Sequence, residues 1–367
     1  MSQAPSQRQS SRAPASAPDD VRNHFSVDLS AVVLAVTGDE PKVLAVVSDA
    51  DDGASHPDAL PSGRLESQHR TLEAGLRSWV ERQTGQSLGY VEQLYTFGDS
   101  NRIVSGANAD VSADRQRVLS IGYLALVREA RVSHVSHVGG SAGEAVWRDW
   151  YRYFPWEDWR DGKPAILARI ELQLKRWCAV AATKEERRLR EERVRIAFGQ
   201  RDIAWSDERV LERYELLYEV GLVPEAHRDL GEIHRGRSGR DEGIQPWAAA
   251  GDAITEGAVM LADHRRVLAT AIARLRGKIK YRPVVFELMP PSFRFLQLQR
   301  AVEALAGLRL HKSNFRRLVE SQGLVEETGE VEVGTGGRPA RLLRFRREVL
   351  LDRPAPGLRL PVARDTR

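Results

Sequence analysis

Two neighbouring segments near the C-terminal end of the chain constrain its fold most strongly. Residues 311–318 have the spacing of a short helix, with a cationic face on one side. The residues available for packing are Leu310, Phe315, Leu318 and Val319. About twenty residues later, Gly-Gly-Arg-Pro-Ala-Arg at 336–341 forms a loop between two strand-like stretches, 330–333 and 341–345. The order predicts a helix followed by a basic β-hairpin.

This order is typical of a winged helix-turn-helix domain that binds double-stranded DNA. In that fold the second helix of the helix-turn-helix enters the major groove, where Arg and Lys bind guanine and Asn binds adenine. Consecutive helical residues point about 100° apart, so Arg316 and Arg317 cannot both read one base, and one of them is expected on a phosphate. Arginines on the wing are expected to contact phosphates or the minor groove. The candidate DNA-binding residues are Lys312, Asn314, Arg316, Arg317, Arg338 and Arg341.

Positive charge is concentrated in the same part of the chain. Residues 263–353 contain 19 Lys or Arg against 10 Asp or Glu, a net charge of +9, whereas the whole chain carries +4 and the remainder therefore −5. Such an uneven distribution suits a domain that displaces counterions from nucleic acid, joined to one that does not. A basic face that is merely solvated would give the same count, so the charge supports the helix and wing without deciding the function.

Length and composition limit the remaining possibilities. With 367 residues, 42% of them hydrophobic, the chain can form two or three ordinary cores. No run approaches the roughly 20 apolar residues of a membrane span, and the polar N-terminus lacks the apolar stretch of a secretory signal. We therefore expect a cytoplasmic protein without a membrane partner. The one cysteine, Cys178, excludes an internal disulfide, and its apolar neighbours predict a packed thiol.

The expected fold class is α+β. Strands are predicted at 27–36 and 42–47, as a hairpin, and at 90–97 and 117–127, with a helix at 71–83. From Glu144 to about residue 226 the pattern becomes helical, including a charged, solvated helix at 184–193 and another at 211–220. Further helices begin at Asp263 and near Ser292, the latter ending at Gly307. The predicted parts are a disordered arm at 1–24, an α/β domain at 25–140, a helical region and linker at 141–253, the winged helix at 254–353 and a tail at 354–367.

Two side-chain clusters have competing interpretations. His134 and His137 lie three residues apart, but without a cysteine or a set of carboxylates nearby we predict no metal site. A group of aromatic residues could stack on a purine, but is better explained as a core that joins the first domain to the helical region. This group comprises Trp147, Trp150, Tyr151, Tyr153, Phe154, Trp156 and Trp159.

Residues 60–66, Leu-Pro-Ser-Gly-Arg-Leu-Glu, and the helix that follows them resemble a decayed Nudix box. Aligning the box on Gly63 leaves one carboxylate, because its five key positions become His69, Arg77, Ser78, Glu81 and Arg82. Aligning it on Gly85 leaves none, because they become Arg70, Ser78, Trp79, Arg82 and Gln83.

The loss of these carboxylates has a direct chemical meaning. Nudix hydrolysis uses several carboxylates from one helix to hold divalent cations against a diphosphate, and Arg or Gln cannot replace them. Arginine can still form bidentate bonds to phosphate oxygens without a metal. We therefore expect a binding pocket with no catalytic residue, no metal and no required cofactor. Its candidate effector-binding residues are Arg64, Glu66, Arg77 and Glu81.

With both halves considered, the chain resembles the Nudix-related transcriptional regulators of NAD metabolism, the NrtR-like and longer NadQ-like proteins. The similar stretches are residues 90–99, 216–224, 263–268, 275–284, 296–300, 312–317 and 336–339. The resemblance implies a Nudix-like α/β/α sandwich at 25–140 as a sensor domain, fused to the winged helix. It also implies a homodimeric repressor of NAD biosynthesis or salvage genes, whose DNA affinity responds to an NAD-related nucleotide, ADP-ribose or NAD.

Two other functions remain open from the sequence. The chain could be a Nudix hydrolase of ADP-ribose or a related dinucleotide, for which Glu66 and Glu81 are the nearby carboxylates of the box. It could instead be a scaffold that binds protein through its helical middle region, in which case it would have no specific DNA affinity.

Overall fold

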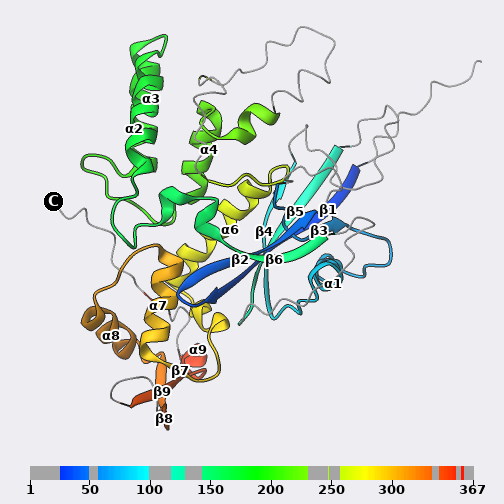
Figure 1. Cartoon of the computed structure of the whole chain (residues 1–367), viewed down its shortest axis with the longest axis vertical. Helices are drawn as coiled ribbons and strands as arrows, with labels where there is room; N and C mark the ends of the chain where they lie inside the picture. Colours follow the sequence, from blue (N-terminus) through cyan, green and yellow to red (C-terminus); the bar gives the residue numbers. More distant parts are fainter. Residues whose placement is uncertain are drawn as a thin grey trace, which may run out of the picture.

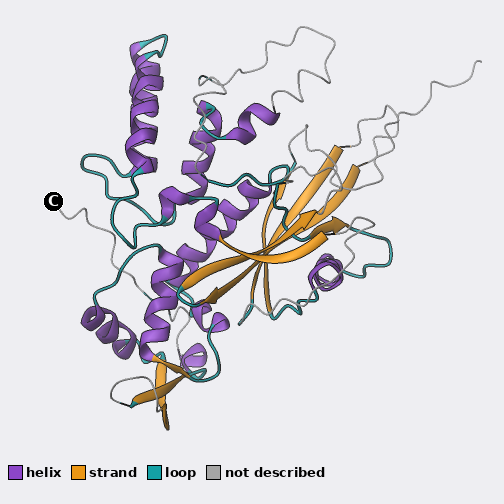
Figure 2. Cartoon of the chain, in the orientation of Figure 1, coloured by secondary structure: helices purple, strands orange, loops and turns teal. Residues whose placement is uncertain are grey.

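The computed structural model describes residues 25–48, 57–98, 117–128, 143–229, 247, 257–332, 339–352 and 357–358. It is an α+β structure with one large mixed sheet and a small sheet near the C-terminal end (Figure 1). Helices lie on both sides of the large sheet (Figure 2). The expected fold class is therefore confirmed.

The large sheet has the strand order β4-β5-β1-β2-β6, and β3 also pairs with β1. β1 is antiparallel to β2 and parallel to β5, and the predicted hairpin turns at Gly38 and Asp39, which both have positive φ. The predicted strands at 90–97 and 117–127 are β4 and β5. The strands are β1 (Phe25–Thr37), β2 (Glu40–Ser48), β3 (Ser62–Arg64), β4 (Tyr90–Phe97), β5 (Arg117–Leu126) and β6 (Gly143–Asp149).

The start of the helical region was predicted wrongly. Residues from Glu144 to Asp149 belong to β6, an edge strand that pairs antiparallel with β2. Only one face of β6 is strongly apolar, with Ala145 buried and Trp147 packed beside it in the core under α1. A strand as short as β6 cannot be recognised from its own sequence, because a few alternating residues are compatible with both a strand and a helix. Its pairing with β2 identifies it. Helical structure begins directly after it, at η1 (Trp150–Arg152) and η2 (Pro155–Glu157).

Both faces of the large sheet are buried. Along β1, Leu29, Ala31 and Val33 enter the core beneath α1 (Leu72–Thr84), whereas Val32 and Leu34 enter the larger core on the opposite side. Burial on both faces explains the nearly continuous apolar run of this strand. Figure 1 shows α1 on one side of the sheet and α6 on the other, so the region has the three α/β/α layers that were expected.

The helical middle region follows its sequence pattern closely. It contains α2 (Ile166–Ala179), α3 (Lys184–Phe198) and α4 (Val210–Val220), and α2 with α3 forms a hairpin that projects from the body (Figure 1). The charged face of α3 is solvated, as predicted, and carries ion pairs within the helix such as Arg187 with Glu191. Cys178 is buried in α2, and burial raises the pKa of its thiol. The predicted packing of this thiol is confirmed.

The C-terminal part contains three main helices and a three-stranded sheet of order β7-β9-β8. Asp263 precedes the first helix as expected, but its side chain makes no capping hydrogen bond there. The next helix begins after Arg294 rather than near Ser292, because Phe293 and Arg294 are extended and pair with β9. The elements are α6 (His264–Ile279), η4 (Val284–Leu288), β7 (Phe293–Arg294), α7 (Phe295–Ala306), α8 (Lys312–Ser321), β8 (Val325–Glu332), β9 (Ala340–Phe345) and α9 (Val349–Asp352).

One hydrophobic core joins the parts that the sequence suggested as separate domains. Val32 of the sheet, Leu167 of the helical region and Leu298 of the winged helix all belong to it. The core interpretation of the aromatic group is confirmed for the five members that are buried there, whereas Trp159 is partly buried and Trp147 packs on the opposite face of the sheet. The five are Trp150, Tyr151, Tyr153, Phe154 and Trp156.

Several predictions fall outside the described residues. They are the arm at 1–24, the pair His134 and His137, and most of the linker that ends at 253. Of the predicted tail, Gly357 and Leu358 are described, and Leu358 is buried and donates its backbone N–H to the carbonyl of Ile279 at 2.8 Å. None of the described helices is both long enough and apolar enough to cross a membrane.

Candidate functional site

The exposed face of α8 is the first candidate site. Phe315 and Val319 anchor the helix, with 3% and 0% of their surfaces exposed, and the ring of Phe315 packs against Phe295 of α7 at 5.5 Å. Because helical residues repeat every 3.6 positions, most of the remaining residues of α8 point outward, and Leu318 is partly buried. All four predicted groups on this helix are exposed: Lys312, Asn314, Arg316 and Arg317.

These side chains already make contacts with one another and with their own helix. Arg317 donates a hydrogen bond from Nη2 to Oδ1 of Asn314 at 3.3 Å, so the structure brings these two candidates together. Arg316 pairs through Nε with Glu320 at 2.8 Å, and both side chains are more than half exposed. An exposed pair of this kind contributes little to stability, so a phosphate can compete for the arginine.

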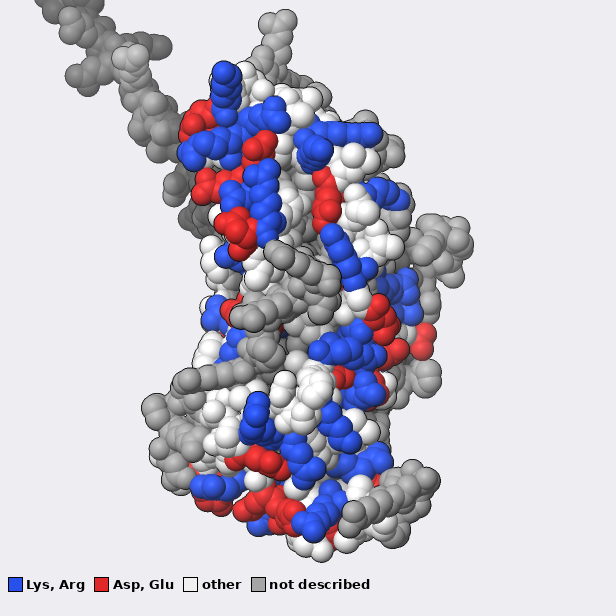
Figure 3. Space-filling view, turned by 90° about the vertical axis from the view of Figure 1, so that its left-hand side faces the viewer, with Lys and Arg blue, Asp and Glu red and all other residues white. Residues whose placement is uncertain are grey.

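The hairpin of β8 and β9 forms the wing beside α8. Arg341 projects from β9 with 74% of its side chain exposed and pairs with Glu327 at 2.6 Å. Arg344, which the sequence analysis did not single out, lies on the same strand and pairs with Glu326 at 2.6 Å. Arg341 and Arg344 are three positions apart, which does not fit the two-residue alternation of a strand, so the pattern gave no signal for Arg344. Arg338 lies outside the described residues. Figure 3 shows Lys and Arg mixed with acidic side chains at this lower end of the molecule, and also at the upper end of the same face.

A buried network lies where the sheet, the helical region and the winged helix meet. The carboxylate of Glu157 receives Arg213 of α4 at 2.5 and 2.8 Å, and Arg276 of α6 at 2.8 Å. All three side chains are at most 1% exposed. Buried charges are tolerated only when they are paired and hydrogen-bonded, which is the arrangement here.

The same network holds the end of α7. Arg276 donates to the carbonyl of Leu305 at 2.9 Å, and Tyr151 donates its hydroxyl to the carbonyl of Ala304 at 2.8 Å. The last carbonyls of a helix lack partners within the helix, so these two side chains satisfy them. Burial raises the pKa of Tyr151 to about 12, which keeps the hydroxyl protonated as a donor. We call the set of Tyr151, Glu157, Arg213 and Arg276 the junction network.

The degenerate Nudix box occupies the other side of the sheet. Gly85 ends α1 in a left-handed conformation, which favours the alignment anchored on it. In that alignment Trp79 covers Gly63, where an added Cβ would lie 2.1 Å from the indole. The Trp79 side chain also donates to the carbonyl of Arg64 at 2.8 Å, and Arg82 stacks on its ring at 3.9 Å.

The side chains of this box do not fit a cluster of divalent cations. Gln83 uses its amide on the backbone of Ser62, accepting at 3.0 Å and donating at 2.8 Å, and Arg82 is a cation. Such clusters need several carboxylate oxygens. Among the residues that the structure describes, no group of three or more His, Cys, Asp or Glu side chains could hold a metal ion.

The four predicted effector-binding residues are only partly brought together. Glu66 lies between His69 and Arg82, at 3.7 and 3.9 Å, just after the exposed Arg64. Arg77 instead pairs with Glu73 and donates to the backbone carbonyls of Leu88 and Gly89.

Glu81 is exposed on α1. The contacts of Arg77 are with its own helix and the following loop.

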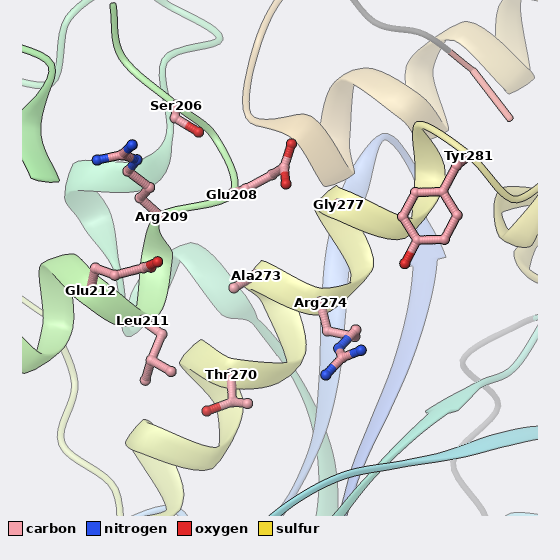
Figure 4. Close-up of a pocket in the computed structure, with 10 residues that line it drawn as sticks. All are labelled: Ser206, Glu208, Arg209, Leu211, Glu212, Thr270, Ala273, Arg274, Gly277 and Tyr281. Atoms are coloured by element: carbon pink, nitrogen blue, oxygen red, sulfur yellow. The ribbon is translucent and has the colours of Figure 1, made fainter. Parts of the chain in front are cut away.

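A further cleft, of about 560 Å³, lies between α4 and α6 (Figure 4). Its lining alternates in charge, with Glu208 and Glu212 beside Arg209 and Arg274, and Tyr281 at one end. Glu208 also pairs with Lys280 at 2.5 Å. This mixture resembles neither a phosphate site nor a metal site, and the sequence analysis did not anticipate it.

Comparison with known proteins agrees with the C-terminal architecture. A family model described as the NrtR DNA-binding winged helix domain matches residues 285–345. A curated relative, the ADPR responsive transcriptional repressor NtrR of Acinetobacter baylyi, is 42% identical over 83 residues, which are 23% of this chain and 33% of the relative. The match therefore spans about a third of the length of that relative.

Among solved structures, NrtR of Shewanella oneidensis complexed with a 27mer DNA is 17% identical, with a TM-score of 0.47 over 88% of this chain and 94% of that one. A MutT/nudix family protein from Enterococcus faecalis is 14% identical, with a TM-score of 0.46 over 92% and 90%. Both scores lie below one half, so the assignment rests on the family model, the curated relative and the described elements. The resemblance to the Nudix-related transcriptional regulators is thereby confirmed for the winged helix, at residues 285–345.

Proposed function

We propose that this chain is a ligand-responsive transcriptional repressor that binds promoter DNA of NAD biosynthesis or salvage genes. The observation that carries the proposal is the face of α8, where four cationic or amide side chains are exposed on a helix anchored by two buried residues. A wing with exposed arginines lies beside it. The printed name of the Acinetobacter relative, which calls it a transcriptional repressor, supports the same function.

In this proposal α8 enters the major groove, where Lys312, Asn314, Arg316 and Arg317 contact bases and phosphates. Arg341 of the wing and Arg338 contact the DNA backbone. Arg316 and Arg341 exchange their exposed carboxylate partners for phosphates, since exposed pairs are weak and DNA offers a high density of negative charge.

We further propose that the Nudix-like region binds an NAD-related nucleotide rather than hydrolysing it. ADP-ribose is the leading effector, because the relative is named as ADPR responsive, and NAD is the other candidate. Arg64, Glu66, Arg77 and Glu81 are the proposed contacts. Because the Nudix box lacks a set of carboxylates for divalent cations, metal-dependent hydrolysis is not part of the proposed function.

The proposed assembly is a homodimer that places two copies of α8 on two half-sites of the promoter. Half-sites spaced by whole turns of DNA require a fixed distance between the two recognition helices. A nucleotide that binds one relative placement of the helices more tightly than another will change the DNA affinity.

The proposal is tested by gel shift with the promoter fragments that lie beside the gene. We expect retardation at low salt, loss of retardation in the double variant Arg316→Ala/Arg341→Ala, and a change in affinity with ADP-ribose or NAD but not with ATP. Light scattering of the purified chain should give the mass of a dimer. Absence of any promoter affinity would exclude the repressor and favour the scaffold.

A second assay addresses the hydrolase alternative. We expect no magnesium-dependent breakdown of ADP-ribose by the purified chain. Breakdown that is abolished by Glu81→Gln would reinstate the enzyme and remove the sensor role.

A further inference from the structure

The turn between α7 and α8 is held by two side chains of α7. Leu310, the last residue before the N-cap of α8, donates its N–H to Oε1 of Glu303 at 3.0 Å and accepts at its carbonyl from Nε2 of Gln299 at 2.9 Å. Gln299 also donates to Oε1 of Glu303 at 2.8 Å. Both backbone groups of Leu310 are therefore fixed to one turn of α7, and the direction in which α8 leaves that turn is fixed with them.

Glu303 is an unusual residue for a surface that is expected to meet phosphates. Its side chain is buried, with 2% of the residue exposed, and its Oε2 receives Arg300 at 3.1 Å and Arg309 at 3.2 Å. Burial acts to raise the pKa of Glu303, but the hydrogen bonds from Gln299, Leu310 and Arg309 outweigh it and the pKa is lowered. The group is thus a carboxylate that uses both oxygens.

Gln299, in contrast, uses only one of its two polar groups. It is 6% exposed, and its Oε1 is buried without a hydrogen-bond partner among the described residues. Its amide therefore contributes through the NH2 group alone, which holds Leu310 and Glu303. A buried amide that leaves its acceptor unsatisfied is uncommon, and here the donated bonds provide the reason for it.

The two arginines on Glu303 also contact the helical middle region and the large sheet. Arg309 donates to the carbonyl of Arg160 at 3.3 Å, and Arg300 lies 3.8 Å from Asp39 in the turn between β1 and β2. Arg300 and Arg309 contribute to the positive charge of residues 263–353, but both contact other groups of the protein.

We propose that Glu303 and Gln299 are positioning residues for DNA recognition, which set the approach of α8 to the major groove without touching DNA. The inference rests on the proposed function, in which α8 reads DNA. A contact displaced by about 1 Å at the base of a recognition helix removes base contacts while leaving the attraction of its cations to phosphates.

The variant Glu303→Gln distinguishes a positioning role from a purely electrostatic one, because the two roles predict changes of opposite sign in the affinity for promoter DNA. If only charge matters, removal of a negative charge tightens binding to every DNA. If Glu303 positions α8, the amide side chain of the variant cannot hold the turn. It has a single acceptor oxygen, which cannot accept from Leu310, Gln299 and two arginines at once. We expect binding to the preferred promoter fragment to weaken by about tenfold, and binding to an unrelated fragment of equal length to stay within about twofold.

Glu348→Gln is the matched control. Glu348 is exposed in the same part of the chain, and its substitution removes the same charge without touching the turn. It should tighten both fragments equally, by about twofold or less. Equal tightening of both fragments by Glu303→Gln would overturn the positioning role.

Gln299→Met provides a second variant that leaves the charge unchanged. It keeps the approximate volume of the side chain but removes both donated hydrogen bonds, so it should also lower the preference for the promoter fragment. Hydrogen exchange of the Leu310 amide, measured without DNA, should be faster in Glu303→Gln than in the parent chain and unchanged in Glu348→Gln. A parent chain that prefers no fragment would overturn the proposed function itself, whereas unchanged preference and unchanged exchange in Glu303→Gln and Gln299→Met would overturn the positioning role alone.

Discussion

The arginines of the junction network and those of α8 and the wing differ in what their charge is used for. Arg213 and Arg276 are 0–1% exposed and share the carboxylate of Glu157, whereas Arg316 and Arg341 are 59% and 74% exposed and pair with glutamates that are also open to water. A buried pair cannot be exchanged without leaving an uncompensated charge, while an exposed pair is easily replaced. The comparison shows that a cation count does not measure a DNA-binding surface.

The largest expected effect is a loss of stability caused by a substitution in the junction network. Glu157→Gln leaves two buried arginines without their carboxylate, and should lower the free energy of unfolding by about 3–5 kcal/mol. Urea denaturation measures this change. Glu191→Gln, which removes the exposed partner of Arg187 on α3, is the control and should cost no more than about 1 kcal/mol. Equal effects of the two variants would contradict the distinction between the regions.

The next effect concerns DNA affinity instead of stability. Arg317→Ala removes an exposed cation from α8, and should weaken binding to the preferred promoter fragment by about 1–3 kcal/mol without changing the urea midpoint. DNA titrations at several salt concentrations show whether Arg317 contacts a phosphate. If it does, the slope of log affinity against log salt concentration is smaller in magnitude by about one in the variant than in the parent chain. A fall in stability comparable to that of Glu157→Gln would show that Arg317 supports the fold, as the buried arginines do, and is not simply an exposed DNA contact.

A glycine substitution tests how closely α7 is seated on the junction. Gly307 has a φ of 71°, and an added Cβ would lie 2.4 Å from the carbonyl oxygen of Glu157 and 2.7 Å from the hydroxyl of Tyr151. Gly307→Ala should cost about 2 kcal/mol in thermal unfolding, from the left-handed backbone and the displaced neighbours. Gly329→Ala in β8 also has a positive φ but meets nothing within 4 Å, so it should cost about 1 kcal/mol. The difference between these two variants measures the close approach.

The smallest expected effect is on the exposed pair of α8. Glu320→Gln releases Arg316 from its partner, and should tighten DNA binding by about threefold or less. Arg316→Gln should weaken binding, and in its background Glu320→Gln should have less effect. Weaker binding by Glu320→Gln alone would mean that the pair holds Arg316 in place for DNA, in the way that we infer for Glu303.

Local patterns predicted most of the elements. The hairpin of β1 and β2, the ends of α1 and α4, and the anchoring of α8 by Phe315 and Val319 follow from periodicity, caps and turns that lie within a few residues of one another. β6 was missed because its partner β2 lies about a hundred residues away in the chain. Arg338 and the effector contacts remain predictions.

By itself, the sequence determined the kind of most major elements, the outward-facing side chains of α8 and the absence of a carboxylate set in the Nudix box. These properties depend on residue type and short spacing alone. Only the tertiary structure decided which of the many arginines are used inside the molecule, and that Glu303 holds the turn before α8. Pairing in a folded chain depends on distances between residues remote in sequence, and burial turns the same charged group from an exchangeable contact into a fixed one.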